Sequence, residues 1–348
     1  MTRRRHFPSI LQTMSGYQLS DWRQSIRQAR RLHADAILLP APWSKMETMA
    51  DILALESLKI EELSQGIKQA RHQRLGVFLD INLPSPHDAY HPRHVLAQFQ
   101  AQHIKPLLVL DLAGMIIRSG NDWPDEAILD LERLVRLKEG AVLFIDHQAA
   151  PDSELLDGQV DGVVDPVGVA GVNRFLNGQC SGFDFEQYLH RQQQRLGINL
   201  AGRVLNPLQL LDVPEPLFGL GAGISFMLRG YPFLSSSAGE NHEHVIGPLG
   251  QLRRQRQALE WGRLVPMSPI ERPEVFAFGR VDERVEAPVV VVARRQASTA
   301  LSLPVALGRF DSRKPFLSLL TQADPYWVHN GWLDLPACDG AELLVLGQ

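Results

Sequence analysis

Residues 1–261 alternate between short apolar runs and longer amphipathic stretches. Each apolar run is about four to seven residues long and hydrophobic at most positions, which is typical of a parallel strand covered on both faces. The runs that predict strands are residues 9–12, 36–39, 76–81, 107–112, 141–146, 162–165, 199–205 and 231–235.

The amphipathic stretches between these runs predict helices. In residues 21–33, for example, Trp22, Ile26 and Ala29 share one face of a helix. The other stretches of this kind are residues 61–73, 93–103, 125–138, 184–195, 221–228 and 248–260. Eight strands that alternate with helices predict an α/β fold, the (β/α)8 TIM barrel.

The pattern changes after Trp261, where helical periodicity disappears and short β-rich runs are separated by turns. These runs are residues 275–278, 288–294, 300–303, 316–320 and 341–346. We therefore predict two domains, a barrel over residues 1–262 and a small antiparallel β-sandwich over residues 263–348.

Composition narrows the class of protein. Hydrophobic residues make up 45% of the chain and charged residues 21%, which is ordinary for a globular protein. The net charge of −4 argues against a nucleic-acid partner, because such proteins concentrate positive charge. Two cysteines, Cys180 and Cys338, suit a reducing compartment. With no apolar run long enough to cross a bilayer, we expect a cytoplasmic protein without a membrane partner.

Barrel enzymes build their sites at the carboxyl ends of the strands. Polar and aromatic residues collect at these predicted positions, and four of them are aspartates, more than packing requires. They are Tyr17, Trp43, Asp80, Asp111, Asp146, His147, Asp165, Asn206 and Glu240, with Trp123 nearby. Any one aspartate could instead cap the following helix, so the group carries more weight than its members.

Several segments resemble the α-amylase family of glycoside hydrolases over almost the whole chain. Gly-Val-Phe-Leu-Asp-Ile-Asn at 76–82 is similar to the third-strand motif, which ends in an aspartate. Leu-Arg-Gly-Tyr-Pro-Phe-Leu at 228–234, followed by Gly-Glu at 239–240, is similar to the eighth strand. Segments 275–280 and 289–293 resemble the opening strands of the family's C-terminal β-sandwich. The resemblance implies the same two-domain fold.

The resemblance also implies catalytic positions, an aspartate nucleophile ending strand four and a glutamate acid/base ending strand five. Aligning strand four on residues 107–112 gives Asp111 as the nucleophile, and strand five then gives Asp146 in place of the glutamate. A second register uses residues 114–118 and puts Arg118 at the nucleophile position. We favour the first register because it leaves room for a full helix before strand five.

Other family features are missing. Strand seven carries no His-Asp pair, and the chain after Asp80 is too short for the large loop domain that often holds calcium. We therefore expect an impaired or inactive protein that binds carbohydrate or a protein partner. The expected substrate-binding residues are Tyr17, Trp43, Asp80, Trp123, His147, Asp165, Asn206 and Glu240. Trp43 and Trp123 would stack on sugar rings, although either could equally be a core residue. The alternative is an atypical retaining glycosidase or transglycosylase that acts on a small α-glucoside through Asp111 and Asp146.

Two further motifs are weaker. Histidines at 87, 91 and 94, and the Glu-Asn-His-Glu-His run at 240–244, contain residue types that bind divalent metals. Exposed polar loops account for them more simply, and we expect no metal and no cofactor. The glycine run at 219–223 lacks the Gly-x-Gly-x-x-Gly spacing of a dinucleotide site.

Overall fold

The computed structural model describes most of the chain, and its contacts divide it into two compact units. The described residues are 7–14, 19–43, 46, 48–55, 60–83, 92–119, 130, 133–134, 136–137, 140–146, 160–164, 166–200, 203–208, 210, 213–235, 240–282, 288–305 and 313–348. The first unit comprises Met1–Asp165, Arg203–Leu205 and Phe233–Glu240, and the second comprises Pro166–Gly202, Asn206–Pro232 and Asn241–Gln348.

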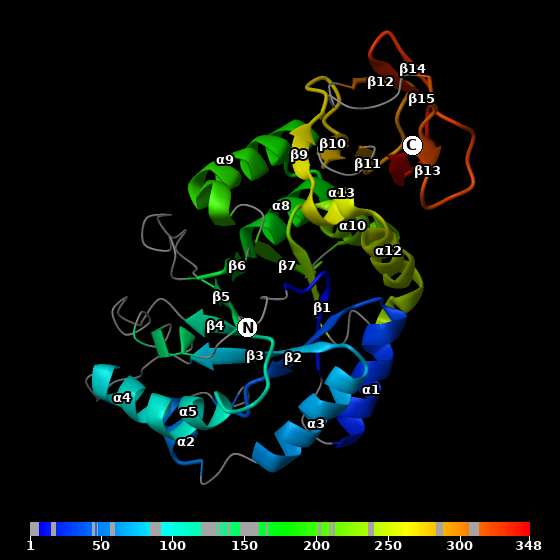
Figure 1. The fold of residues 1–348 in the computed structure, drawn as a ribbon. Helices are drawn as coiled ribbons and strands as arrows, with labels where there is room; N and C mark the ends of the chain where they lie inside the picture. Colours follow the sequence, from blue (N-terminus) through cyan, green and yellow to red (C-terminus); the bar gives the residue numbers. More distant parts are fainter. Residues whose placement is uncertain are drawn as a thin grey trace. The chain divides into compact units, whose positions relative to one another are not determined.

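Eight parallel strands close into a barrel in the order β1 to β8 (Figure 1). The strands are β1 (Leu11–Thr13), β2 (Ala36–Pro40), β3 (Gly76–Leu83), β4 (Gly114–Ser119), β5 (Val142–Asp146), β6 (Gly162–Val164), β7 (Val204–Leu208) and β8 (Tyr231–Leu234). The predicted TIM barrel is confirmed.

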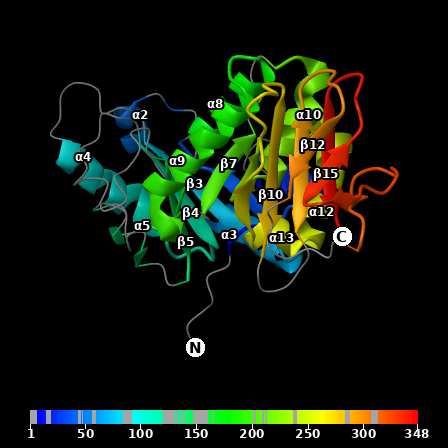
Figure 2. The same ribbon diagram turned by 90° about the horizontal axis from the view of Figure 1, so that it is seen from above.

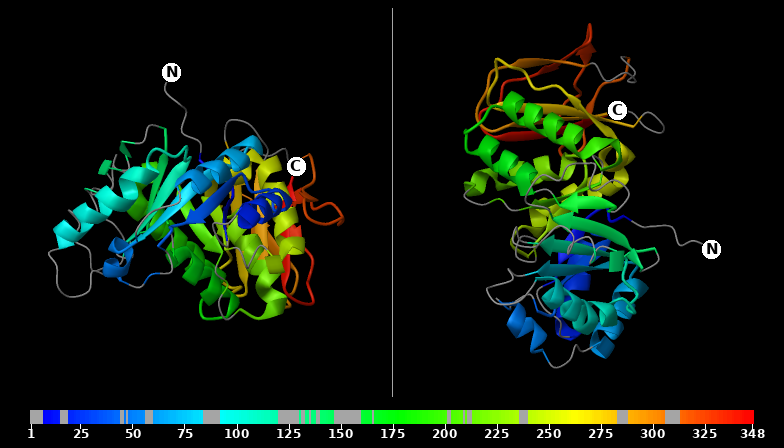
Figure 3. Two further views of the ribbon diagram at one scale, coloured as in Figure 1. Left: turned by 90° about the horizontal axis from the view of Figure 1, so that it is seen from below. Right: turned by 90° about the vertical axis from the view of Figure 1, so that its left-hand side faces the viewer.

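Helices follow most of the strands. In the first unit they are α1 (Leu19–Arg31), α2 (Met49–Leu53), α3 (Ile60–His72), α4 (Pro92–Phe99), the π-helical turn η1 (Gln100–Ile104) and α5 (Lys105–Leu107). In the second they are α8 (Pro166–Leu176), α9 (Gly182–Leu200), α10 (Glu215–Met227), α12 (Glu243–Gln255) and α13 (Gln257–Trp261). Helices α1 and α3 lie side by side, as do α8 and α9 (Figures 1 and 3). Most of the predicted helix at 125–138 lies outside the described residues.

Large aromatic side chains fill the barrel interior next to glycines. Phe78 on β3 and Phe144 on β5 approach to 6.2 Å between ring centroids, although β4 separates the two strands. The rings fit because Gly114 on β4 and Gly162 on β6 lie beside them, where a Cβ atom would overlap a phenylalanine ring. The alternation of side chains along a strand then points residues 80, 118 and 146 into the same interior.

Two predicted strands are displaced. The fourth was expected at residues 107–112, but Leu107 ends α5 and β4 begins at Gly114. The seventh was expected to begin at residue 199, but α9 continues to Leu200 and β7 begins at Val204. In both places a second apolar run adjoins the first, so hydrophobicity does not distinguish a helix end from a strand.

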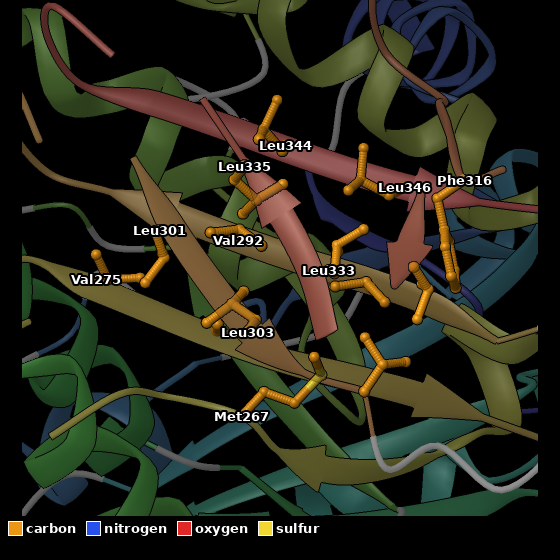
Figure 4. Close-up of a cluster of buried hydrophobic side chains, with 14 of the residues drawn as sticks. Met267, Val275, Val292, Leu301, Leu303, Phe316, Leu333, Leu335, Leu344 and Leu346 are labelled. Carbon is orange, nitrogen blue, oxygen red and sulfur yellow. The ribbon is translucent and has the colours of Figure 1, made fainter. Parts of the chain in front are cut away.

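The second unit ends in two antiparallel sheets, as expected. Their strands are β9 (Arg263–Pro266), β10 (Val275–Val281), β11 (Val289–Arg294), β12 (Leu301–Pro304), β13 (Leu317–Ser318), β14 (Val328–His329), β15 (Trp332–Leu335) and β16 (Glu342–Gly347). One sheet has the order β13-β16-β11-β10-β9 and the other β12-β15-β14. Strands β10, β12 and β15 are labelled in Figure 2. Apolar side chains of both sheets form a single core, with Leu303 and Leu333 from one sheet and Val292 and Leu346 from the other (Figure 4).

The domain boundary at 262/263 stays a prediction. The last barrel strand ends at Leu234, and β9, the first strand of the second sheet, begins at Arg263. The contacts nevertheless group helices α8 to α13 with the antiparallel sheets. The sequence pattern alone does not reveal this grouping, because it depends on which helix faces pack together.

Two buried arginines stabilise the end of α10. Arg253 donates to the carbonyl oxygens of Leu228 and Gly230, and Arg280 donates to that of Met227 at 2.7 Å. Carbonyl groups at a helix C-terminus lack partners within the helix and carry partial negative charge, so a guanidinium group there is favourable. The glycine run at 219–223 lies inside α10, so it forms no phosphate-binding loop.

Candidate functional site

Three charged side chains lie in the carboxyl-terminal halves of β3, β4 and β5. Asp146 ends β5, but the expectation that Asp80 ends the third strand is wrong, because β3 continues to Leu83. Arg118 and Asp146 are register partners on neighbouring strands. The Nε atom of Arg118 lies 2.9 Å from Oδ1 of Asp80, and the two side chains are 28% and 14% exposed. We call Asp80, Arg118 and Asp146 the mouth cluster. Because carboxyl ends of barrel strands form the sites of barrel enzymes, this cluster is the candidate site.

An aromatic ring fixes where Arg118 points. Its guanidinium carbon lies 5.3 Å from the centroid of the Phe233 ring on β8, within the range of a cation–π contact. Strands β4 and β8 lie on opposite sides of the closed barrel. The two side chains can therefore meet only inside it, which places the positive charge in the barrel interior.

Burial dominates the electrostatics of Asp80. It raises the pKa of the Asp80 carboxyl above its ordinary value of 3.8, because the charged form loses water. The guanidinium group of Arg118 opposes this rise in pKa, and the nearby carboxylate of Asp146 adds to it. Arg118 thus compensates a pair of carboxyl groups that repel one another.

The structure decides the register of strand four. Asp111 precedes β4, so it lies near the strand's amino end, and its carboxylate pairs with Arg71 of α3. The prediction that Asp111 ends the fourth strand is wrong. The second register is the one observed, and it puts Arg118 near the carboxyl end. The physical reason is that Gly114 fits beside the Phe78 ring in the barrel interior.

Solved structures with the same fold are numerous, but their sequences differ widely from this one. An α-amylase from Geobacillus thermoleovorans, solved with acarbose, aligns with a TM-score of 0.74 at 11% identity and covers 98% of both chains. A debranching enzyme from Nostoc punctiforme gives 0.70 at 11% identity over 100% of both chains. An α-amylase from Lactobacillus plantarum gives 0.66 at 12% identity over 97% of this chain and 98% of its own. No family model and no curated protein matches the sequence.

The chain has the α-amylase fold. The match extends over nearly the full length of the chain, barrel and antiparallel sheets together.

Trp43 belongs to the core. Its side chain is 1% exposed, and its indole N–H donates to the carbonyl oxygen of Asn82 at 3.0 Å. The ring meets Phe99 of α4 edge-on at 5.0 Å and also packs against His103. The prediction that Trp43 faces the mouth and stacks on a sugar is wrong, because the indole is enclosed by the helices that follow β3.

His103 is a buried titratable group that was not predicted from the sequence. The signal was its spacing, since Leu96, Phe99 and His103 share one face of the predicted helix at 93–103. Burial lowers the pKa of this imidazole below its ordinary value of 6.5, and a contact with the backbone of Ile52 opposes part of the change.

We expect His103 to make the protein less stable in mild acid. Above pH 6.5, the ordinary value, the ring is neutral in both states, but below it the unfolded chain binds a proton more readily than the folded one. The free energy of unfolding should fall as the pH drops from 6.5, and His103→Phe should reduce this dependence. Urea unfolding between pH 5 and 8 measures it. A His190→Gln variant at an exposed position is the control, and an unchanged slope in His103→Phe would contradict the expectation.

Asn206 and Glu240 each form a side-chain hydrogen bond within the chain. Asn206 lies in the middle of β7 rather than at its end, because the strand continues to Leu208. Its side-chain N–H group donates to the carbonyl oxygen of Arg229 at 2.9 Å. Glu240 is exposed and accepts a hydrogen bond from Gln24 at 2.9 Å. A role for either residue in binding stays a prediction.

Four predicted residues lie outside the described part of the chain: Tyr17, Trp123, His147 and Asp165. The histidines at positions 87 and 91 lie outside it too. Among the residues that the structure describes, no three His, Cys, Asp or Glu side chains gather closely enough to hold a metal ion. No helix in that same part of the chain is long and apolar enough to cross a membrane.

Proposed function

We propose that this chain is a carbohydrate-binding protein of α-amylase fold that does not hydrolyse glycosidic bonds. One observation carries the proposal, the arginine at position 118. It lies near the end of β4, where the α-amylase family resemblance requires the aspartate nucleophile, and its guanidinium group pairs with Asp80.

A retaining glycosidase needs a carboxylate nucleophile and a second carboxyl group as acid/base, about 5–5.5 Å apart. A guanidinium group stays protonated and only donates hydrogen bonds, so it cannot attack the anomeric carbon. Its positive charge also opposes the positive charge that develops on the sugar in the oxocarbenium-like transition state. Arg118 thus removes the nucleophile and disfavours the reaction electrostatically.

Binding is compatible with the same groups. Sugar hydroxyl groups both donate and accept hydrogen bonds, and the mouth cluster offers carboxylate acceptors beside a guanidinium donor. The Geobacillus enzyme of the same fold was solved with acarbose, which supports a carbohydrate as the ligand class. The alternative glycosidase, which relies on Asp111 and Asp146, is less favoured, because Asp111 precedes β4 and its carboxylate pairs with Arg71.

The test combines an activity assay with calorimetry. We expect purified protein to release no reducing sugar from maltooligosaccharides beyond the level of an Asp146→Asn variant, while it binds maltoheptaose with measurable heat. Turnover that Asp146→Asn or Asp80→Asn abolishes would overturn the non-hydrolytic assignment. A protein that neither cleaves nor binds any glucan would favour a protein-interaction role instead.

We also propose that the protein works in a reducing compartment such as the cytoplasm. Cys180 and Cys338 are both free thiols, as expected where disulfides do not persist. Cell fractionation with an antibody against the chain would test this location.

A further inference from the structure

A cleft of about 810 Å³ lies on the three-stranded sheet of the second unit. Its polar and aromatic lining comes mainly from the segment 322–327, from β14 and from β15. The lining residues used below are Gln322, Asp324, Tyr326, Trp327, His329 of β14 and Asp334 of β15. We call it the C-terminal cleft. Its volume is within the range of small-molecule sites, which is about 300–1,000 Å³.

The pairing of the strands decides which side chains face outward. Leu303 pairs with Leu333, and both belong to the buried core. Side chains alternate along a strand, so their neighbours Ser302 and Asp334, also register partners, project from the opposite face. His329, next to buried Val328, projects from that face too. The cleft is thus built on the outer face of this sheet.

Hydrogen bonds hold the lining in place. The hydroxyl group of Ser302 donates to Oδ1 of Asp334 at 2.5 Å, which orients this carboxylate. Tyr326 exchanges two backbone hydrogen bonds with Phe316, at 2.7 and 2.8 Å, and its ring packs against the core. A site whose groups are already positioned loses less conformational entropy when a ligand binds.

Trp327 is the exposed aromatic group of the cleft. It is 46% exposed although it follows the anchored Tyr326. Trp332, on the neighbouring strand β15, is equally exposed at 48% but does not line the cleft. Because Trp327 is exposed beside polar groups that are already positioned, its ring is available to a ligand in the cleft.

We propose that the C-terminal cleft binds a neutral oligosaccharide, with a sugar ring stacked on Trp327 and its hydroxyl groups bonded to Asp334, Asp324 and His329. The apolar C–H face of a pyranose fits an aromatic ring. The mixture of donors and acceptors, including the Gln322 amide, fits hydroxyl groups, which need both. A cationic ligand would use the acceptors alone. This proposal rests on the proposed function, carbohydrate binding by this protein, and adds the C-terminal cleft as a second binding site besides the mouth cluster.

The experiment compares two tryptophan variants of the full chain. Trp327→Ala should weaken binding of maltoheptaose, measured by calorimetry, by about tenfold, which corresponds to roughly 1.4 kcal/mol. Trp261→Ala removes an indole of similar exposure, 55%, from the end of α13 outside the cleft and should leave the Kd unchanged. Asp334→Asn should weaken binding as well. Thermal unfolding of each variant confirms that it is folded.

The outcomes separate this proposal from the proposed function. If wild type and Trp327→Ala bind maltoheptaose with the same affinity, and likewise cellohexaose, the proposed sugar site in the cleft is overturned. Carbohydrate binding by the protein then still stands. If the cleft binds tetramethylammonium but no sugar, and Trp327→Ala abolishes the binding of tetramethylammonium, the proposal of a neutral oligosaccharide ligand is overturned. Hydrolysis of the glucan would overturn the proposed function alone. A selective loss in Trp327→Ala supports the cleft.

Discussion

Replacing Arg118 with methionine is expected to lower the free energy of unfolding by about 2–3 kcal/mol at neutral pH, somewhat less than the loss of one partner from a fully buried ion pair. The substitution leaves the carboxyl groups of Asp80 and Asp146 close together without the cation between them. It also removes the ring contact with Phe233. Urea unfolding at pH 7 measures the effect.

The pH dependence identifies the cause. Without Arg118, the pKa of Asp80 should rise further, so the folded state binds a proton more readily than the unfolded chain, whose carboxyl has the ordinary value of 3.8. Stability lost at pH 7 should therefore be partly regained as the pH falls toward 4. Arg118→Lys should retain much of the stability, and Arg133→Met, at an exposed pair, should change it little. A loss that is independent of pH would refute the electrostatic account.

Replacing Gly182 with alanine is expected to destabilise the second unit by about 3 kcal/mol, the upper part of the range for overpacking. Gly182 begins α9, where its Cα lies against the backbone of β10. A methyl group there would overlap the carbonyl group of Val275, and neither backbone can move without separating the helix from the sheet. Thermal unfolding should show a lower Tm.

Gly340→Ala is the matched control for this substitution. Gly340 has no atom near the place where a Cβ would lie, and its φ is not positive. The variant should unfold within about 0.5 kcal/mol of the wild type, as surface substitutions usually do. Equal stability of Gly182→Ala and Gly340→Ala would mean that α9 does not pack against β10 as described.

Much of the candidate site follows from the sequence, but the predictions for Asp111 and Trp43 are wrong. Asp80 and Asp146 belong to apolar runs that form β3 and β5; Asp146 ends its strand as expected, whereas β3 continues three residues past Asp80. Arg118 was considered only in the less favoured register. The cleft around Trp327 was missed altogether, although Asn330 and Gly331, both at positive φ, form the tight turn typical of a hairpin and could have located β14 and β15.

The order of apolar runs and amphipathic stretches by itself determined the parallel barrel and the β-rich end of the chain, because alternation of strands and helices is a local property of the sequence. It could not decide between two adjacent apolar runs for β4. That choice depended on Gly114 fitting beside Phe78, a contact between residues 36 positions apart. Nor could it show that Trp43 is buried while Trp327 is exposed, since burial depends on which segments pack over each ring. Tertiary packing also placed the Arg118 guanidinium group in the barrel interior, beside Asp80 and the Phe233 ring.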